Sequence, residues 1–400
     1  MRKYVDMRGH IKNLEAKGLL KRVERVMNKD TEIHPLVRWQ YRGGLRDSER
    51  MGFLFENVID ARGRRYLYPV AVGVMAGSNK VYATGLGCKV EEVLSKWQVA
   101  LEHPIEPVLM KSGSVHEVVM VGKDLTGMEG GLYKFPFPIS TPGFDNAPYS
   151  TCSNWVTKDP ETGIQNIGNY RGHIKAPNRI GVFPSILGQD IYLHWEKCKK
   201  RGIPLEAALV IGPPPVVSYA AVEKVPYGVD EMAIAGGLAG EPIEVVKCKT
   251  VDLVVPADAE LVIEGKISTE YLEPEGPFGE SHGYMHPRQL NPYMDVTAIT
   301  HRELVQPEQH IVRPFELEQW PEPRRAVAQS IVQRQRRHER QLRRQRLGRR
   351  LTQQQRGVQI ARRRGPGAAA PAAPRALAAR RDPQRPTLAG ARTRQRLGVS

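Results

Sequence analysis

Two acidic residues flank a glycine-proline loop in the stretch EGPFGESHGY, which begins at Glu275 and has its second acid at Glu280. Glycine and proline give a tight backbone that other groups can approach closely. Paired carboxylates suit acid–base catalysis when their surroundings separate their pKa values. A polar surface turn is the alternative, but Phe278 and Tyr284 favour a partly buried loop.

Polar residues also gather in the stretch NIGNYR, residues 166–171. Asn166 and Arg171 lie five residues apart with Gly168 between them, which fits a loop or strand that faces a ligand. Taken alone, the stretch is more simply a turn with an exposed arginine. It becomes a candidate site only together with the other clusters.

Glu244 opens an apolar stretch, EVVKC, that has the composition of a β-strand. Burying a carboxylate costs free energy unless the group is paired or bound to a cation. Glu244 is therefore either an edge residue with its carboxylate in water or a cation ligand.

Several function classes find no support in the sequence. It has no G-x-G-x-x-G after a strand, no P-loop, no H-E-x-x-H and no G-x-S-x-G, the usual signals of nucleotide, zincin and α/β-hydrolase chemistry. The four cysteines form no CxxC pair, which favours buried thiols over a zinc site or a disulfide framework. The charged start and the lack of a long apolar run predict a cytoplasmic protein without a membrane span.

The elements that must position these residues fall into two regions. In residues 1–114, the spacing of Met7, Ile11 and Leu14 predicts a helix that ends near Gly18. Short apolar runs at 53–55 and 70–74 predict buried strands, and residues 90–102 return to helical spacing. This region is predicted to be an α/β domain.

Residues 115–302 are predicted to form a β-rich domain. Proline and glycine separate its apolar runs, which lie at 115–121, 205–211, 243–255 and 259–267. One amphipathic helix is expected near 190–201. The pattern indicates an antiparallel barrel or sandwich with inserted helices.

The net charge of +16 is concentrated in one segment. Residues 321–400 contain 22 arginines, no lysine and three acidic residues, so they carry +19 and leave −3 for residues 1–320. Lysine ends at Lys266 and aromatic residues end at Trp320. Residues 303–400 have too few large apolar groups to offset their conformational entropy, which predicts a disordered or loosely helical tail.

The three clusters, in this order and at this separation, resemble the UbiD family of prenylated-FMN decarboxylases. The likeness begins with YVDMR at residues 4–8, continues through LFEN at 54–57 and ends with ITHR at 299–302, about three quarters of the chain. Its most specific part is Glu244 to Cys248 followed by Pro274 to Glu280.

The resemblance implies an α+β fold, with an N-terminal α/β region and a central split β-barrel that binds flavin. It implies prenylated FMN as cofactor, held through its phosphate by Mn²⁺ or Mg²⁺, with K⁺ nearby. It implies metal ligands at Asn166, Asp190 and Glu244. The positions that match cofactor-contacting residues of the family are Asn169, Tyr170, Arg171, Gly188 and Gln189.

The resemblance also implies a reaction, because Arg171, Glu275 and Glu280 match the family's catalytic Arg-Glu-Glu set. The reaction is non-oxidative decarboxylation, or the reverse carboxylation, of an aromatic or α,β-unsaturated carboxylic acid. Arg171 would clamp the substrate carboxylate with its planar fork, Glu280 would deliver the proton, and Glu275 would hold Arg171. The implied partners are a flavin prenyltransferase that supplies the cofactor and, with an intact C-terminal region, further copies of the chain.

The sequence departs from the family pattern in two places. In the family the third metal ligand is often a histidine at a fixed distance after the asparagine. At that distance from Asn166 this sequence has Gln189, and a loop one residue longer would place Asp190 there instead. An aspartate is a hard oxygen ligand that suits Mn²⁺ or Mg²⁺. Family members also continue into a C-terminal domain that supplies a lysine to the cofactor phosphate. Nothing after Arg302 matches that domain, which predicts impaired cofactor binding or activity.

Other interpretations stay open at this point. Residues 303–400 are a basic tail that binds nucleic acid or acidic surfaces, a solvated tail without a role, or out-of-frame translation of a GC-rich gene. The first makes the chain a nucleic-acid-binding protein whose binding weakens steeply with salt and vanishes without residues 321–400. A metal-dependent acid–base enzyme without flavin is a further alternative.

Overall fold

The computed structural model describes residues 4–184, 188–280 and 283–304. All of these belong to one compact unit, Met1–Gln306. The Arg-rich segment 321–400, and with it the nucleic-acid interpretation, lies outside the described residues.

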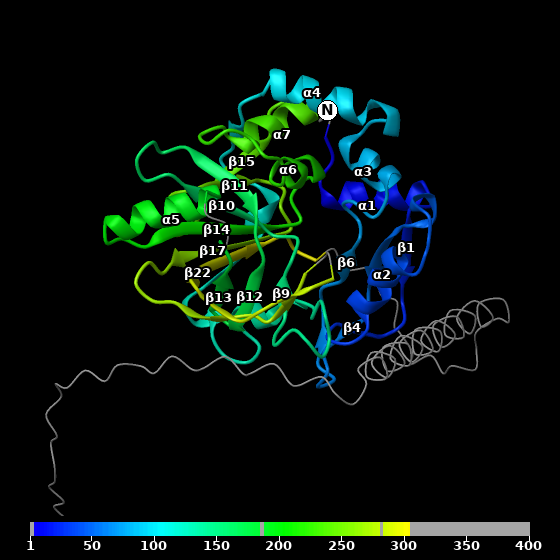
Figure 1. The fold of residues 1–400 in the computed structure, drawn as a ribbon, viewed down its shortest axis with the longest axis horizontal. Helices are drawn as coiled ribbons and strands as arrows, with labels where there is room; N and C mark the ends of the chain where they lie inside the picture. Colours follow the sequence, from blue (N-terminus) through cyan, green and yellow to red (C-terminus); the bar gives the residue numbers. More distant parts are fainter. Residues whose placement is uncertain (1–3, 185–187, 281–282, 305–400) are drawn as a thin grey trace, which may run out of the picture. The chain divides into compact units, whose positions relative to one another are not determined.

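The N-terminal part combines helices with two small sheets (Figure 1). In one sheet, β1 (Leu20–Val23) pairs in parallel with β3 (Gly52–Phe55), which pairs antiparallel with β6 (Val70–Val72). The other sheet joins three two-residue strands, β2 (Met27–Asn28), β4 (Val58–Ile59) and β5 (Arg65–Tyr66). The helices of this part are α1 (Met7–Ala16), α2 (Ile33–Arg42), α3 (Asn79–Leu86) and α4 (Val93–Glu102).

Helix α1 forms where the spacing predicts it. The Asp6 side chain caps its N-terminus by accepting from the backbone N–H of Gly9, and the chain turns off at Gly18, whose φ is +66°. Helix α2 is not apparent in the sequence, because Pro35 interrupts its pattern. Pro35 lies in the first helical turn, where no backbone donor is lost.

A nine-stranded antiparallel sheet fills the centre and curls into a half barrel, which confirms the predicted mixed fold with a split barrel (Figure 1). The path runs β11-β10-β14-β17-β22-β13-β12-β9, with β8 also paired to β22. The strands, in chain order, are β8 (Val118–Val121), β9 (Tyr149–Ser150), β10 (Asn154–Lys158), β11 (Gln165–Asn169), β12 (Gly172–Ala176), β13 (Arg179–Val182), β14 (Leu205–Ile211), β17 (Leu261–Ile267) and β22 (Tyr293–His301).

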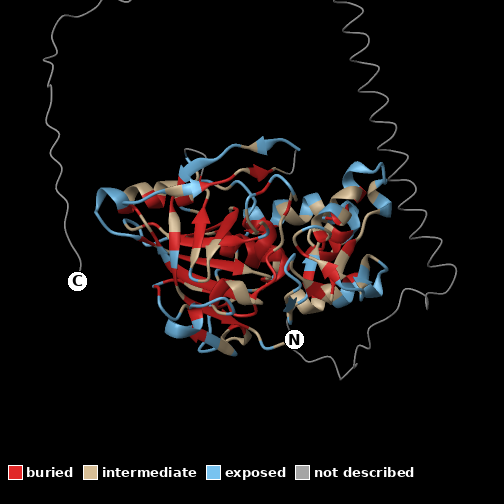
Figure 2. Cartoon of the chain, turned by 90° about the horizontal axis from the view of Figure 1, so that it is seen from below, coloured by how far each residue is buried: buried red, intermediate tan, exposed pale blue. Residues whose placement is uncertain are grey.

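The sheet has a core on each face, so its central strands are buried on both sides (Figure 2). Strand β14 illustrates this alternation, with Ala207 and Leu209 in one core and Ala208 and Val210 in the other. This burial explains why residues 205–211 form an almost unbroken apolar run rather than an alternating one.

Three helices and three small sheets complete the central region. Helix α5 (Asp190–Lys200) packs on one core, while α6 (Pro215–Ala220) and α7 (Glu231–Ala239) pack on the other. The small sheets pair β7 (Val108–Leu109) with β15 (Glu244–Lys247) and β16 (Val254–Pro256), β18 (Glu273–Glu275) with β21 (Gln289–Asn291), and β19 (Phe278–Gly279) with β20 (Met285–His286). Within the described ranges, no helix is both long and apolar enough to cross a membrane.

Candidate active site

Arg171 lies between β11 and β12 and forms a buried ion pair with Glu275 of β18. Its Nε donates to Glu275 Oε1 at 2.9 Å, and its Nη2 donates to Oε2 at 2.7 Å. Two parallel bonds between the guanidinium fork and one carboxylate fix the plane of the guanidinium as well as its position.

Glu280 contacts the remaining edge of the same guanidinium, because its Oε1 accepts from Arg171 Nη1. The structure thus brings together the three residues that the resemblance assigns to catalysis, from the β11–β12 connection, β18 and the turn after β19. The two acids differ in environment: the Glu275 side chain is 1% exposed and the Glu280 side chain is 27% exposed. Glu280 is therefore the acid that solvent or a ligand can reach.

Two aromatic rings pack against Arg171. Its Cζ lies 3.7 Å from the ring centroid of Phe183 and 4.7 Å from that of Phe278. His286 of β20 adds a contact of 3.4 Å between its Nδ1 and Arg171 Nη2. These rings exclude water from the ion pair and attract the cation, so Arg171 is held in one orientation before any ligand arrives.

Further donors satisfy Glu275, and the sequence gives no signal for them. The hydroxyl of Tyr149 accepts from the backbone N–H of Gly276 at 3.1 Å and hydrogen-bonds Glu275. Asn291 Nδ2 lies 3.4 Å from Glu275 Oε2. Burial, followed by the Glu275 charge, raises the pKa of Tyr149, so this phenol stays protonated and available as a donor.

His173 of β12 stacks on the Tyr149 ring, with centroids 4.8 Å apart, and is buried. Burial lowers the pKa of His173 from 6.5 to about 4. The unfolded chain then binds this proton more readily than the folded one. The stability that neutral His173 contributes is therefore complete above about pH 6.5 and is lost as the pH falls toward 4.

Replacing His173 by Phe, which keeps the stack, is expected to remove this contribution. The free energy of unfolding of the wild type minus that of His173→Phe should fall by about 3 kcal/mol between pH 7 and pH 4. Urea titrations at the two pH values measure this, and other titrating groups cancel in the difference. A difference that does not change with pH would mean that His173 titrates normally in the folded chain.

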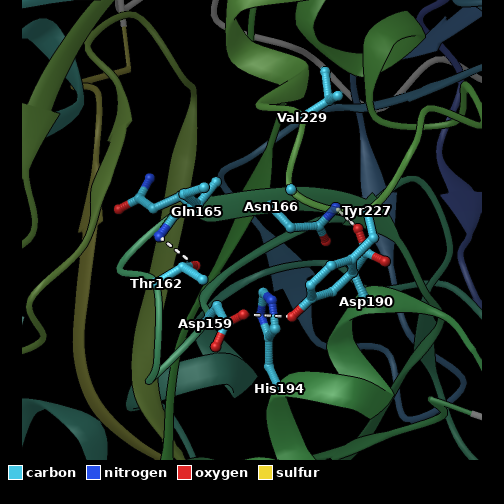
Figure 3. A pocket seen from close by; sticks show the side chains of 10 residues that line it. Asp159, Thr162, Gln165, Asn166, Asp190, His194, Tyr227 and Val229 are labelled. Atoms are coloured by element: carbon cyan, nitrogen blue, oxygen red, sulfur yellow. Dashed lines mark hydrogen bonds between the residues drawn. The ribbon is translucent and has the colours of Figure 1, made fainter.

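A second cluster joins β11, α5 and α7 around Asn166. Its Nδ2 donates to Asp190 Oδ2 at 2.9 Å and to Glu231 Oε1 at 2.7 Å, and Figure 3 shows the contact with Asp190. Glu231 Oε2 also accepts from the backbone N–H of Ile167 at 3.1 Å. Burial raises the pKa of Glu231 to about 7, and burial also raises the pKa of Asp190. Two desolvated carboxylates this close favour a cation or a proton between them.

Glu244 does not join this cluster. It lies in β15, opposite Val108 of β7, and its backbone N–H donates to the Tyr4 hydroxyl at 3.3 Å. The carboxylate that reaches Asn166 comes from Glu231, the first residue of α7, behind the cap residue Asp230. The only sequence signal for Glu231 is this pair of acids immediately before the apolar stretch MAIAGGLA.

The remaining predicted cofactor contacts lie at the C-terminal end of β11 and immediately before α5. Asn169 is exposed and its Oδ1 accepts from the backbone N–H of Ser153 at 3.0 Å, while Tyr170 is half-buried. Gly188 and Gln189 precede α5, and the φ of Gly188 is +95°. Of the two adjacent residues that the sequence left open as third metal-site residue, Gln189 and Asp190, it is Asp190 that accepts a hydrogen bond from Asn166.

Comparison with known proteins places this fold and site in a family. The UbiD model, described as the 3-octaprenyl-4-hydroxybenzoate carboxy-lyase Rift-related domain, matches residues 109–312. The chain belongs to the UbiD family. The match contains both clusters of this UbiD chain and continues beyond Arg302, where the resemblance seen in the sequence ends.

Uncharacterised relatives of this UbiD chain occur in Synechocystis sp. and Aquifex aeolicus. They are 31% and 32% identical over 74% and 75% of the chain. The chain spans only 61% and 63% of the length of these relatives.

Solved UbiD-class structures share the fold. The enzyme HmfF from Pelotomaculum thermopropionicum, an evolved dimeric form in complex with prFMN, is 35% identical with a TM-score of 0.66, over 74% of this chain and 65% of that one. Vanillic acid decarboxylase of Sedimentibacter hydroxybenzoicus in its closed form is 28% identical with a TM-score of 0.68, over 75% of this chain and 62% of that one.

Proposed function

We propose that this chain carries the active site of a prenylated-FMN-dependent carboxy-lyase, which removes CO₂ from an aromatic or α,β-unsaturated carboxylic acid or adds it back. The observation that carries the proposal is the ion pair in which Arg171 donates two hydrogen bonds to buried Glu275. The partly exposed Glu280 lies on the other edge of the guanidinium. The likeness to HmfF in complex with prFMN and in complex with FMN supports the flavin.

The cluster at Asn166 fits a divalent cation. Asn166 Oδ1 and Gln189 Oε1 are buried and have no hydrogen-bond partner among the described residues. Among the described residues, no group of three or more His, Cys, Asp and Glu side chains is placed to hold a metal ion, so this would be a site of two carboxylates and an amide. Hard oxygen donors suit Mn²⁺ or Mg²⁺, with K⁺ as a further ion. We therefore assign Asn166, Asp190 and Glu231 to the cation, with Glu231 in place of Glu244.

Arg171 would bind the substrate carboxylate through the Nη1 edge that Glu280 now covers. Since Glu275 keeps the other edge, the guanidinium need not reorient when Glu280 moves away. The carbon–carbon bond to the carboxylate breaks, CO₂ leaves without the bonding electrons, and a proton from the Glu280 carboxylic acid takes its place on carbon. Prenylated FMN, when bound, would supply the electron sink for the electron pair that CO₂ leaves on the carbon. Asn169, Tyr170, Gly188 and Gln189 are proposed to contact the flavin.

The partners follow from the same proposal. A flavin prenyltransferase would supply the cofactor in the cytoplasm, and copies of the chain would assemble if the region after the barrel were intact. The test is co-expression of the full 400-residue chain with a flavin prenyltransferase. Purified protein should carry a flavin absorbance and release CO₂ from at least one member of a panel of aryl and acrylic acids. Protein that folds but carries no flavin would refute the proposal.

The cation assignment makes its own prediction. Glu231→Gln and Asp190→Asn should each weaken Mn²⁺ binding by at least about tenfold, because each removes a negative donor from an all-oxygen site. Glu244→Gln, which makes the same change in β15, should leave Mn²⁺ binding unchanged. Mn²⁺ titration followed by electron paramagnetic resonance measures all three. Weakening by Glu244→Gln but not by Glu231→Gln would return the assignment to Glu244.

A further inference from the structure

Helix α5 carries two parallel rows of side chains. Its apolar row packs into the core beneath the sheet and consists of Ile191, Trp195 and Cys198. Its polar row is displaced by one position, with a spacing that keeps its members on one helical face. The polar row consists of Asp190, His194, Lys197 and, at the C-terminal cap, Arg201.

The polar row faces the hairpin of β10 and β11. At the start of α5, Asp190 accepts from Asn166, as described above. One turn later, His194 Nδ1 lies 2.9 Å from Thr157 Oγ1, and both residues are buried. These two levels lie at the end of the helix that is next to Asn166.

Two more levels extend this row toward the tip of the hairpin. Lys197 Nζ donates to Asp159 Oδ2 at 2.7 Å, and Arg201 donates to the carbonyl oxygen of Pro160 at 2.6 Å. Contacts at four successive levels fix the rotation of α5 about its axis. That rotation decides whether the Asp190 carboxylate points at Asn166, because a helix turns by about 100° per residue.

Asp159 also reaches the segment that leads into α7. Its Oδ2 accepts from the Tyr227 hydroxyl at 2.5 Å, and the Tyr227 ring makes an edge contact with the His194 ring, with centroids 6.0 Å apart. Tyr227 is three residues before Asp230, the cap of α7, and Glu231 is the first residue of that helix. Asp159 therefore connects to both elements that bring a carboxylate to Asn166.

The same pocket contains both groups of residues. It is lined by Asp159, His194 and Tyr227 together with Asn166 and Asp190 (Figure 3). The side chains of Asp159 and Tyr227 point toward one another in this view, beside His194. Asp159, Lys197 and Tyr227 have no role in the proposed reaction. The burial of the Asp159 carboxylate therefore requires another explanation.

We infer that Asp159, with Lys197 and Tyr227, is a positioning group that sets the separation of Asp190 and Glu231 for a divalent cation. This inference rests on the proposed function, because it concerns the cation that the proposal assigns to these carboxylates. It adds three residues that do not touch the cation themselves. Metal ligands need positions accurate to about 0.2 Å, so a small rotation of α5 or a shift of α7 changes affinity.

The burial and charge of Asp159 favour lasting contacts with Lys197 and Tyr227. The Asp159 side chain is only 2% exposed, and its Oδ1 also accepts from the backbone N–H of Glu161 at 2.8 Å. Burial alone would raise the pKa of Asp159, but bonds from Lys197 and Tyr227 outweigh it and hold the pKa well below its usual range. Removing Lys197 leaves a buried carboxylate short of a donor, so the surrounding elements must shift to expose it.

The test measures Mn²⁺ affinity in the full chain by electron paramagnetic resonance, alongside the melting temperature. Lys197→Met and Tyr227→Phe are expected to raise the Kd for Mn²⁺ by about tenfold or more. Replacing a residue that orients a metal ligand typically weakens metal binding by about that much. Lys197→Arg, which keeps a donor for Asp159, should recover most of the affinity. Lys158→Met is the matched control, because Lys158 lies on β10 and pairs with the exposed Asp252. It should leave the Kd unchanged.

The outcomes separate the inference from the proposed function. If the wild type binds no Mn²⁺, the proposed cation site fails. If the wild type binds Mn²⁺ and both Lys197→Met and Tyr227→Phe match it, the inference alone fails. A fall in melting temperature with unchanged Kd would also overturn it, because that is the result of a purely structural role. Tyr227→Phe alone decides if Lys197→Met does not fold.

Discussion

Replacing Glu280 by Gln is expected to abolish turnover while flavin binding survives. The amide has the size of the acid and can still meet Arg171 Nη1, but it has no acidic proton to give to the carbon that loses CO₂. General acid–base groups contribute about 10²–10⁴ in rate, so at least a hundredfold loss is expected. The measurement is CO₂ release by the co-expressed holoprotein, with the flavin absorbance recorded on the same sample.

A matched variant separates the loss of the proton from a general effect of removing a carboxylate. Glu270→Gln makes the same change at an exposed position five residues before Glu275 and should keep wild-type rates. Wild-type rates in Glu280→Gln would remove Glu280 from the role of proton donor. Loss of the flavin absorbance in Glu280→Gln would instead indicate that Glu280 helps to hold the cofactor.

The two acids of this site could be proposed from the sequence because they lie in one short stretch with an unusual composition. The loop EGPFGE keeps Glu275 and Glu280 within five residues of each other, so their proximity follows from the chain itself. Arg171 lies more than a hundred residues away, and its place beside them came from the family resemblance rather than from any local pattern.

Glu231 could not be predicted in the same way. Its contact with Asn166 joins residues 65 positions apart, and no local pattern records such a contact. Helix α7 is apolar on nearly every side because it is buried between other elements, so its sequence has no helical alternation to reveal it. The strand-like stretch after Glu244 is the stronger sequence signal, but β15 lies in another sheet than Asn166, which is why we propose Glu231 instead.

Periodicity predicted the elements that pack on one face and missed those that pack on several. Helices α1 and α5 have clear polar and apolar faces, and they lie where the spacing places them. The strands from β9 to β13 are short and mix polar with apolar residues. Their neighbours in the curled sheet, rather than their own sequences, determine which of their side chains are buried. Tertiary contacts decide such segments, so sequence propensity says little about them.

Removing the charge of Arg171 is expected to destabilise the chain by several kcal/mol. Arg171→Met leaves the Glu275 carboxylate buried without its two strongest donors, and losing one partner of a buried pair costs about 3–5 kcal/mol. Arg171→Met combined with Glu275→Gln leaves no fully buried unpaired charge, because the remaining acid, Glu280, is 27% exposed, and it should recover most of that loss. Urea unfolding of the two single variants and the double variant gives the coupling energy.

The exposed pair Arg179–Asp295 is the control for this cycle, because its side chains are 37% and 53% exposed. Arg179→Met with Asp295→Asn should give a coupling below about 1 kcal/mol. If the Arg171 cycle gave a value that small, water would reach Glu275 in the folded chain. The site would then lack the dry surroundings that hold Arg171 ready for a carboxylate, and catalysis would need closure by another part of the protein. A large coupling means instead that the folded chain orients Arg171 before substrate or cofactor binds.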